Sequence, residues 1–350
     1  MGVGSVARAI KRAYIGVGGV ARPCWPAGAP QLYGTVTALS VARQELTGAS
    51  IGGYALFAGG IVVSTTFANT VDAYSTSLVK STPTALTVAG YKLGGASVGS
   101  YALFVGGYST ASIKNANAYD TNLVKTIPTE LSVGKNDMGS TSLPDYALFG
   151  TSSVVDAYNK SLVRSIPTAL SVSRDSLKAT TVGSYALFAG GKVTLSISAV
   201  VDAYDSSLVR STATALSEPR HLHSAATAGG YALFAGGSSN TTGTASITAV
   251  ETYTASLVKS TATALSAARV YMAATSIGEY ALFGGGIDSS GARSATVEMY
   301  DANLSRTTLP ALSAARNGLG AATVGNYALF AGGYIFANSA TCAVVDAYAA

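Results

Sequence analysis

The residues best suited to chemistry in this 350-residue chain are its two histidines, His221 and His223, which flank Leu222. Alternate residues of an extended strand point to the same side, so the two imidazoles could face one metal ion. A zinc site needs a third protein ligand, and neither a cysteine nor another histidine stands near this pair. The sequence therefore predicts no metal site, and nothing in it indicates a cofactor.

A second chemical pattern is an acidic residue followed eight positions later by a basic one. Such pairs could serve as proton donors and acceptors in a hydrolase, but their recurrence along the chain favours a structural role. We predict that each pair bridges two neighbouring strands as an exposed ion pair, worth about 0–1 kcal/mol. The pairs are Asp72 with Lys80, Asp156 with Arg164, Asp202 with Arg210, Glu251 with Lys259, and Glu298 with Arg306.

Charge and cysteine content exclude several classes of protein. The net charge is +5, but residues 1–30 hold Arg8, Lys11, Arg12 and Arg22 with no acid, which leaves 18 basic against 17 acidic residues. A nearly neutral body lacks the basic face that nucleic acids need. Apolar runs are too short for a membrane span, and the two cysteines, at 24 and 342, have no metal-binding or redox spacing.

The elements that position these residues repeat seven times. In six copies a Gly-Gly pair follows the tetrapeptide Tyr-Ala-Leu-Phe after one intervening residue, and a second tyrosine comes 9 to 19 residues after the phenylalanine. The tetrapeptides begin at Tyr54, Tyr101, Tyr146, Tyr185, Tyr231, Tyr280 and Tyr327. The second tyrosines are Tyr74, Tyr119, Tyr158, Tyr204, Tyr253, Tyr300 and Tyr348.

Each repeat reads as four short antiparallel strands, and Tyr-Ala-Leu-Phe is apolar on both faces. A sheet packed on both sides is typical of radially stacked blades. The last repeat lacks a fourth strand, whereas residues 35–43 resemble the end of a fourth strand without the first three. The sequence therefore predicts an all-β, seven-bladed propeller over residues 31–350, closed by an N-terminal strand that completes the last blade.

The repeats resemble kelch repeats. A basic residue opens the unit, an apolar strand runs into Gly-Gly, and a tyrosine lies near the end of the third strand; the usual tryptophan of the fourth strand is replaced by leucine, as at Leu162. The opening residues are Arg43, Arg174, Arg220, Arg269 and Arg316. The resemblance implies a propeller of the kelch-like kind, in which the repeated arginines are structural.

The first 30 residues form a basic, glycine-rich arm with a near-duplication, Gly-Val-Gly-Ser-Val-Ala-Arg and Gly-Val-Gly-Gly-Val-Ala-Arg, before Trp25. This arm is similar to N-terminal segments of tail-associated structural proteins of phages and prophages of Gram-positive bacteria. The resemblance implies a virion-tail location and docking to other virion proteins through Arg8, Lys11, Arg12, Arg22 and Trp25. A flexible leader on a protein of the bacterial cytoplasm is the alternative.

Diversity is concentrated directly after the opening basic residue and in the loop between the second and third strands, which a four-stranded meander places on one face. Constant scaffolds with variable loops are typical of binding proteins. We predict a non-enzymatic module that binds a host surface glycan or protein. The alternatives are a bacterial protein-interaction scaffold and an envelope-polysaccharide enzyme, which is disfavoured because no carboxylates cluster on this face. The predicted face comprises Gln44, Glu45, Tyr91, Lys92, Asn136, Asp137, Asp175, Ser176, His221, Leu222, Val270, Tyr271, Asn317 and Gly318.

Overall fold

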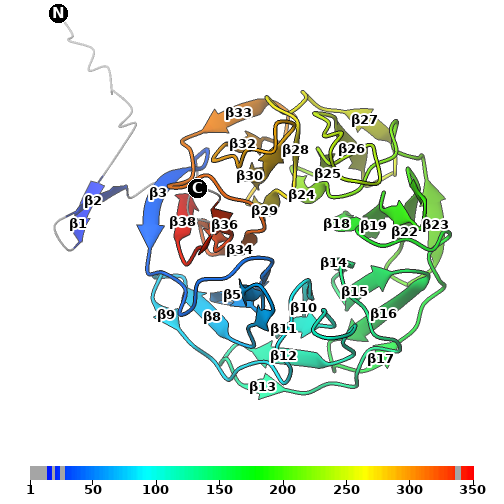
Figure 1. The fold of residues 1–350 in the computed structure, drawn as a ribbon, viewed down its shortest axis with the longest axis horizontal. Coiled ribbons are helices and arrows are strands. Elements are labelled where there is room, and N and C mark those ends of the chain that lie inside the picture. Colours follow the sequence, from blue (N-terminus) through cyan, green and yellow to red (C-terminus); the bar gives the residue numbers. More distant parts are fainter. Residues whose placement is uncertain (1–13, 18–19, 24–27, 336–339) are drawn as a thin grey trace, which may run out of the picture.

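The computed structural model describes residues 14–17, 20–23, 28–335 and 340–350, and its regular structure is β-strand. Seven four-stranded antiparallel sheets stand around one central axis (Figure 1). The predicted all-β, seven-bladed propeller is confirmed. No helix formed by the described residues is long and apolar enough to cross a membrane.

We number the blades in chain order and name the strands of each from the axis outwards. Blades 1 to 4 are β4 (Thr47–Ile51), β5 (Tyr54–Ala58), β8 (Val71–Ser75) and β9 (Lys80–Ser81); β10 (Gly94–Val98), β11 (Tyr101–Val105), β12 (Ala116–Asp120) and β13 (Lys125–Thr126); β14 (Gly139–Ser142), β15 (Tyr146–Thr151), β16 (Val154–Asn159) and β17 (Arg164–Ser165); and β18 (Lys178–Val182), β19 (Tyr185–Ala189), β22 (Val201–Tyr204) and β23 (Arg210–Ala213). Blades 5 to 7 are β24 (Ser224–Ala228), β25 (Tyr231–Ala235), β26 (Val250–Thr254) and β27 (Lys259–Thr261); β29 (Ala273–Ile277), β30 (Tyr280–Gly284), β32 (Val297–Tyr300) and β33 (Arg306–Leu309); and β34 (Gly320–Val324), β35 (Tyr327–Ala331), β38 (Val345–Ala349) and β3 (Gln31–Val36).

Short two-stranded sheets extend the loops of several blades. Three of them join strands that follow each other in the chain: β6 (Ile61–Val63) with β7 (Thr66–Phe67), β20 (Lys192–Val193) with β21 (Ser196–Ile197), and β36 (Tyr334–Ile335) with β37 (Ala340–Thr341). In blade 6, β28 (Arg269–Val270) before the innermost strand pairs with β31 (Ile287–Asp288) after the second strand. In the N-terminal arm, β1 (Tyr14–Val17) pairs with β2 (Val20–Pro23).

The ring closes between blades 7 and 1. Strand β3, from the N-terminal part of the chain, pairs along β38 and supplies the outermost strand of blade 7, as predicted. The innermost strands also meet closely at this junction. A Cβ atom on Gly48 of β4 would lie 2.1 Å from the backbone oxygen of Ala321 in β34, so only glycine fits there. Closure therefore depends on both an exchanged strand and a residue without a side chain.

The core lies between blades and not within one sheet. In blade 1, Phe57 and Tyr74 form an edge-to-face pair with centroids 5.9 Å apart and pack against Leu329 and Val345 of blade 7. The Tyr74 hydroxyl donates a 2.7 Å hydrogen bond to the backbone oxygen of Thr37, just after β3. The other six repeat tyrosines make the equivalent bond to the preceding blade. This packing explains why Tyr-Ala-Leu-Phe is apolar on both faces.

Candidate functional site

The two residues that follow each opening basic residue lie in different environments. In most blades, the backbone of the first residue forms a β-bridge with the start of the loop between the second and third strands. Examples are Gln44 with Ile61 and Asp175 with Lys192. In blade 3, the side chain of Asn136 instead donates a 2.7 Å hydrogen bond to the Ser112 hydroxyl. Both kinds of loop therefore lie on one face, as the sequence predicted.

The second of the two residues forms what we call the axial ring. Its members, one per blade, are Glu45, Lys92, Asp137, Ser176, Leu222, Tyr271 and Gly318, and all have φ between 48° and 65°. The backbone N–H of a ring residue donates to the carbonyl of the ring residue before it, with N···O distances between 2.7 and 3.4 Å in six of the seven steps. Within the described residues, no such bond joins the Leu222 N–H to the Ser176 carbonyl. The ring of hydrogen bonds is thus closed except at one joint, between blades 4 and 5.

The backbone of the axial ring disfavours side chains. The left-handed conformation costs a residue with a Cβ atom about 1–2 kcal/mol, whereas glycine adopts it freely. Only Gly318 takes that option, while the other six positions carry six different side chains. Each blade outside the seventh has a second non-glycine position with positive φ, in the turn before the outer strand, and it is leucine in every one. Those leucines are Leu78, Leu123, Leu162, Leu208, Leu257 and Leu304.

The uniform leucines have a packing role, because they contact the apolar clusters between blades. The axial ring residues share no such common role, since their side chains range from an acid to a lysine and a tyrosine. Packing alone does not account for side chains retained there at an energetic cost. The axial ring is therefore our candidate functional site.

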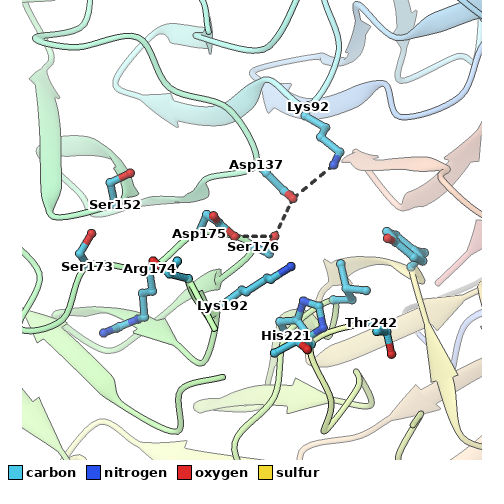
Figure 2. A pocket seen from close by; sticks show the side chains of 14 residues that line it. Lys92, Asp137, Ser152, Ser173, Arg174, Asp175, Ser176, Lys192, His221 and Thr242 are labelled. Carbon is cyan, nitrogen blue, oxygen red and sulfur yellow. Dashed lines mark hydrogen bonds and ion pairs between the residues drawn. The ribbon is translucent and has the colours of Figure 1, made fainter. Parts of the chain in front are cut away.

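A cavity of about 670 Å³ opens at the axial ring over blades 2 to 6 (Figure 2). Five ring residues contribute to its wall, together with two first-position residues, Asp175 and His221. We call this space the mouth cavity. Its lining residues are Lys92, Asp137, Ser152, Ser173, Arg174, Asp175, Ser176, Lys192, Thr194, His221, Leu222, Thr241, Thr242 and Tyr271. Most of them carry polar groups, so the cavity suits a hydroxylated or charged ligand.

A series of side-chain contacts between charged and polar residues, which we call the charged chain, crosses the axial ring at blades 2 to 4. The Ser176 hydroxyl lies 2.7 Å from a carboxylate oxygen of Asp137 and 3.1 Å from one of Asp175, and Lys92 Nζ lies 3.4 Å from Asp137 (Figure 2). Burial alone would raise the pKa of Asp137, but the charges of Lys178 and Lys92 and the Ser176 hydrogen bond together lower it. Asp137 is therefore ionised at neutral pH. The prediction that no carboxylates cluster on this face is wrong, because separate repeats each bring one acid to the axis.

One wall of the mouth cavity is braced by a loop of blade 5. Asn240 accepts hydrogen bonds from the backbone of Thr244 (3.0 Å) and Ala245 (3.3 Å), and its own carbonyl lies 2.8 Å from His221 Nε2. Burial lowers the pKa of His221, and the bond to Asn240 offsets this only in part. The imidazole is thus neutral at pH 7 and holds the loop in place. Thr241 and Thr242 are presented to the cavity by this loop.

The acid–base pairs do form, but the prediction that they are exposed is wrong. The basic partners lie 2.9 to 3.8 Å from carboxylates that are themselves fully or almost fully buried. Each carboxylate is also paired, inside the blade, with the buried cation that opens the repeat. These inner pairs are Arg43 with Asp72 (2.8 Å), Lys135 with Asp156 (2.6 Å), Arg174 with Asp202 (2.8 Å), Arg220 with Glu251 (2.5 Å), and Arg269 with Glu298. Blade 7 has an inner pair as well, Arg316 with Asp346 (2.6 Å), without an outer basic partner eight residues on.

Blade 2 shows that the two inner partners depend on each other. Gly90 replaces the opening cation and Asn117 replaces the acid, so the pair is lost as a unit. The Ile113 side chain occupies the space beside Gly90, where a Cβ atom would lie 2.6 Å from its Cδ1. The side-chain oxygen of Asn117 still accepts a hydrogen bond from the Thr87 N–H at 3.0 Å. The repeated arginines are therefore parts of the scaffold.

The histidines, cysteines and arm residues that the sequence analysis singled out do not come together in one site among the described residues. His223 is fully buried against Phe234 between blades, so it does not share a site with His221. Cys342 is a buried free thiol. Among the described residues, no group of three His, Cys, Asp or Glu side chains could hold a metal ion. Of the predicted arm residues, Arg22 lies in β2, whereas Arg8, Lys11, Arg12 and Trp25 lie outside the described residues, as does Cys24.

Sequence reasoning missed two lysines near the axis. Lys178 begins the innermost strand of blade 4, at a position where the other six blades have Thr, Gly, Ser or Ala, and its charge acts on both Glu45 and Asp137. That departure from the repeat was a usable signal. Lys192 begins a hairpin whose sequence varies in every blade, so nothing marked it in advance.

No protein-family model matches the chain, and no curated protein matches it. The likeness to kelch repeats and to phage tail proteins consequently rests on the residues quoted above.

Proposed function

We propose that this chain is a non-enzymatic binding module that takes its ligand at the axial ring and mouth cavity. One observation carries the proposal: six of seven structurally equivalent left-handed positions bear different side chains where glycine would be more stable. Residues that cost stability without a packing role are typical of functional sites. The polar lining of the cavity agrees with recognition of a hydroxylated or charged partner.

We further propose that the module belongs to a phage or prophage tail, where residues 1–30 dock onto other virion proteins and the propeller engages a host surface glycan or protein. The support is the resemblance of the arm to tail-associated proteins of Gram-positive phages. A scaffold that binds proteins in the bacterial cytoplasm is the alternative, and it would use the same face.

An enzyme acting on envelope polysaccharide is a second candidate, favoured by one observation. Burial raises the pKa of Glu45, while the pKa of Asp137 is lowered, and carboxyl groups tuned apart in this way can act as an acid and a base. The two acids line a cavity of about 150 Å³ together with Lys92, Lys178 and leucine, methionine and tyrosine side chains, and this volume is too small for a sugar chain. Binding without hydrolysis is therefore the preferred proposal.

The test uses labelled full-length protein, clustered on a multivalent carrier, on a panel of intact Gram-positive cells. The double variant K92G/Y271G removes two ring side chains and keeps the backbone favourable, so we expect lost cell binding without lost thermal stability. The control V209S changes an exposed outer-turn residue and should bind normally. Normal binding by the ring variant would exclude the axial ring as the site. Binding to no strain would direct the search for partners to virion or cytoplasmic proteins, and release of reducing sugar that E45Q abolishes would establish the enzyme.

A further inference from the structure

The open joint of the axial ring borders the mouth cavity. Ser176 donates its N–H to the Asp137 carbonyl at 3.0 Å, and the Leu222 carbonyl accepts the Tyr271 N–H at 3.2 Å. Their other backbone groups, the Ser176 carbonyl and the Leu222 N–H, have no hydrogen-bond partner among the described residues. Each residue exposes only 8% of its surface. Backbone groups without a protein partner are uncommon in the interior of a protein, and here both belong to residues that line the mouth cavity, where a ligand could pair with them.

The two groups are complementary to a single chemical unit. A trans secondary amide carries one donor and one acceptor on opposite sides. Placed in the joint, its N–H would donate to the Ser176 carbonyl and its oxygen would accept from the Leu222 N–H. The amide would thereby continue the same direction of hydrogen bonding that the other six steps of the ring follow.

We propose that the joint binds the acetamido group of an N-acetylated amino sugar; this rests on the proposed function and names its ligand. The surroundings favour a sugar over a peptide. The charged and hydroxyl groups of Asp175, Lys192 and Thr242 suit the hydroxyl groups of a sugar, whereas a peptide would need apolar pockets for its side chains. Leu222 and Tyr271 supply apolar surface for the acetyl methyl group. The volume of about 670 Å³ lies in the range of small-ligand sites.

One wall of the site is held in place before binding. The loop that carries Thr242 is held by the Asn240 hydrogen bonds and by His221, so binding requires little ordering of this loop. The charged chain of Lys92, Asp137 and Ser176 fixes the opposite side.

The test titrates ¹⁵N-labelled full-length protein with three probes: the disaccharide of N-acetylglucosamine, cellobiose, which has a hydroxyl in place of each acetamido group, and an N-acetylated dipeptide amide. We expect the N-acetylated disaccharide to bind at least about tenfold more tightly than cellobiose, because cellobiose leaves the donor and acceptor of the joint unpaired. The Leu222 amide resonance should shift more than the other ring amides. Equal affinity for the two disaccharides, binding of neither, or tighter binding of the dipeptide would each overturn the proposal.

Two variants separate the amide from the rest of the sugar. K192A should weaken both disaccharides to a similar degree and preserve their ratio, since Lys192 faces hydroxyls. L222G keeps the N–H and the positive φ but removes the contact with the methyl group, so the ratio should fall. Cell binding that requires the axial ring but is not inhibited by the N-acetylated disaccharide would refute this inference and leave the proposed function intact.

Discussion

Removing one partner of an inner ion pair should destabilise the propeller far more than replacing both partners by the uncharged residues that blade 2 has at the same positions. In blade 4, Arg174 Nη2 lies 2.8 Å from Asp202 Oδ2, and neither side chain is exposed. The same arginine has one other contact, from Nη2 to the Phe188 carbonyl at 3.0 Å, while its Nε and Nη1 lack partners among the described residues. In D202N the buried guanidinium therefore loses its only counter-charge within the blade.

Breaking a buried pair in this way costs about 3–5 kcal/mol. At about 2 °C per kcal/mol for a protein of this size, the melting temperature should fall by about 6–10 °C. The triple variant R174G/S198I/D202N copies Gly90, Ile113 and Asn117 of blade 2, removing both charges and filling the space. Its cost should stay below about 2 kcal/mol, because both inner charges are gone, Arg210, which loses Asp202, is partly exposed to water, and the cavity is small.

Guanidinium denaturation followed by circular dichroism gives both free energies of unfolding. The matched control is N117D, which places an acid in blade 2 without an inner cation and should be destabilising even though it restores the consensus of the repeat. If the triple variant were as unstable as D202N, the inner pair would contribute through packing alone, and the argument from paired charges would be wrong.

Three further predictions concern the core and the closure of the ring. Burial lowers the pKa of His223 well below 6.5, so the folded state resists protonation of this side chain. The free energy of unfolding should therefore decrease as the pH falls below 6.5, by up to about 1.4 kcal/mol per pH unit. Denaturation at pH 7.5 and 5.0 should show a smaller decrease for H223L than for the natural chain. G48V should strongly lower the melting temperature because its Cβ would meet the Ala321 oxygen, whereas G53A, with open space around it, should not; equal effects would contradict the close approach of blades 1 and 7. Deletion of residues 31–43 should give aggregates in size-exclusion chromatography, because the edge of β38 would be exposed, and a cooperatively melting monomer would count against strand exchange.

The sequence was sufficient for the fold because Tyr-Ala-Leu-Phe recurs with the same double-sided apolar pattern, and because residues 35–43 match a fourth strand that the last repeat lacks. It also placed Glu45, Lys92 and Tyr271 on one face, through the geometry of a meander. It did not predict their left-handed backbone, since residues with side chains normally avoid positive φ and nothing local requires it here.

The inner ion pairs were missed for a different reason. The acid eight residues before Lys80 suggested only a hairpin pair, whereas the separation of Arg43 from Asp72 includes a loop whose length varies among the blades. Because this separation ranges from 21 to 31 residues among the blades, no fixed spacing revealed the buried partner. The available signal was that blade 2 replaces both partners together, by Gly90 and Asn117, because a buried charge without a partner is strongly destabilising.

The single open joint of the axial ring has a mechanical consequence. A closed ring shares any widening among all of its joints, whereas a ring split at one place yields there first. Radial breathing of the propeller should accordingly be concentrated between blades 4 and 5, next to the mouth cavity. In hydrogen–deuterium exchange the Leu222 amide should exchange fastest among the axial-ring amides. A ligand that bridges the joint would close the ring of hydrogen bonds and should slow this exchange.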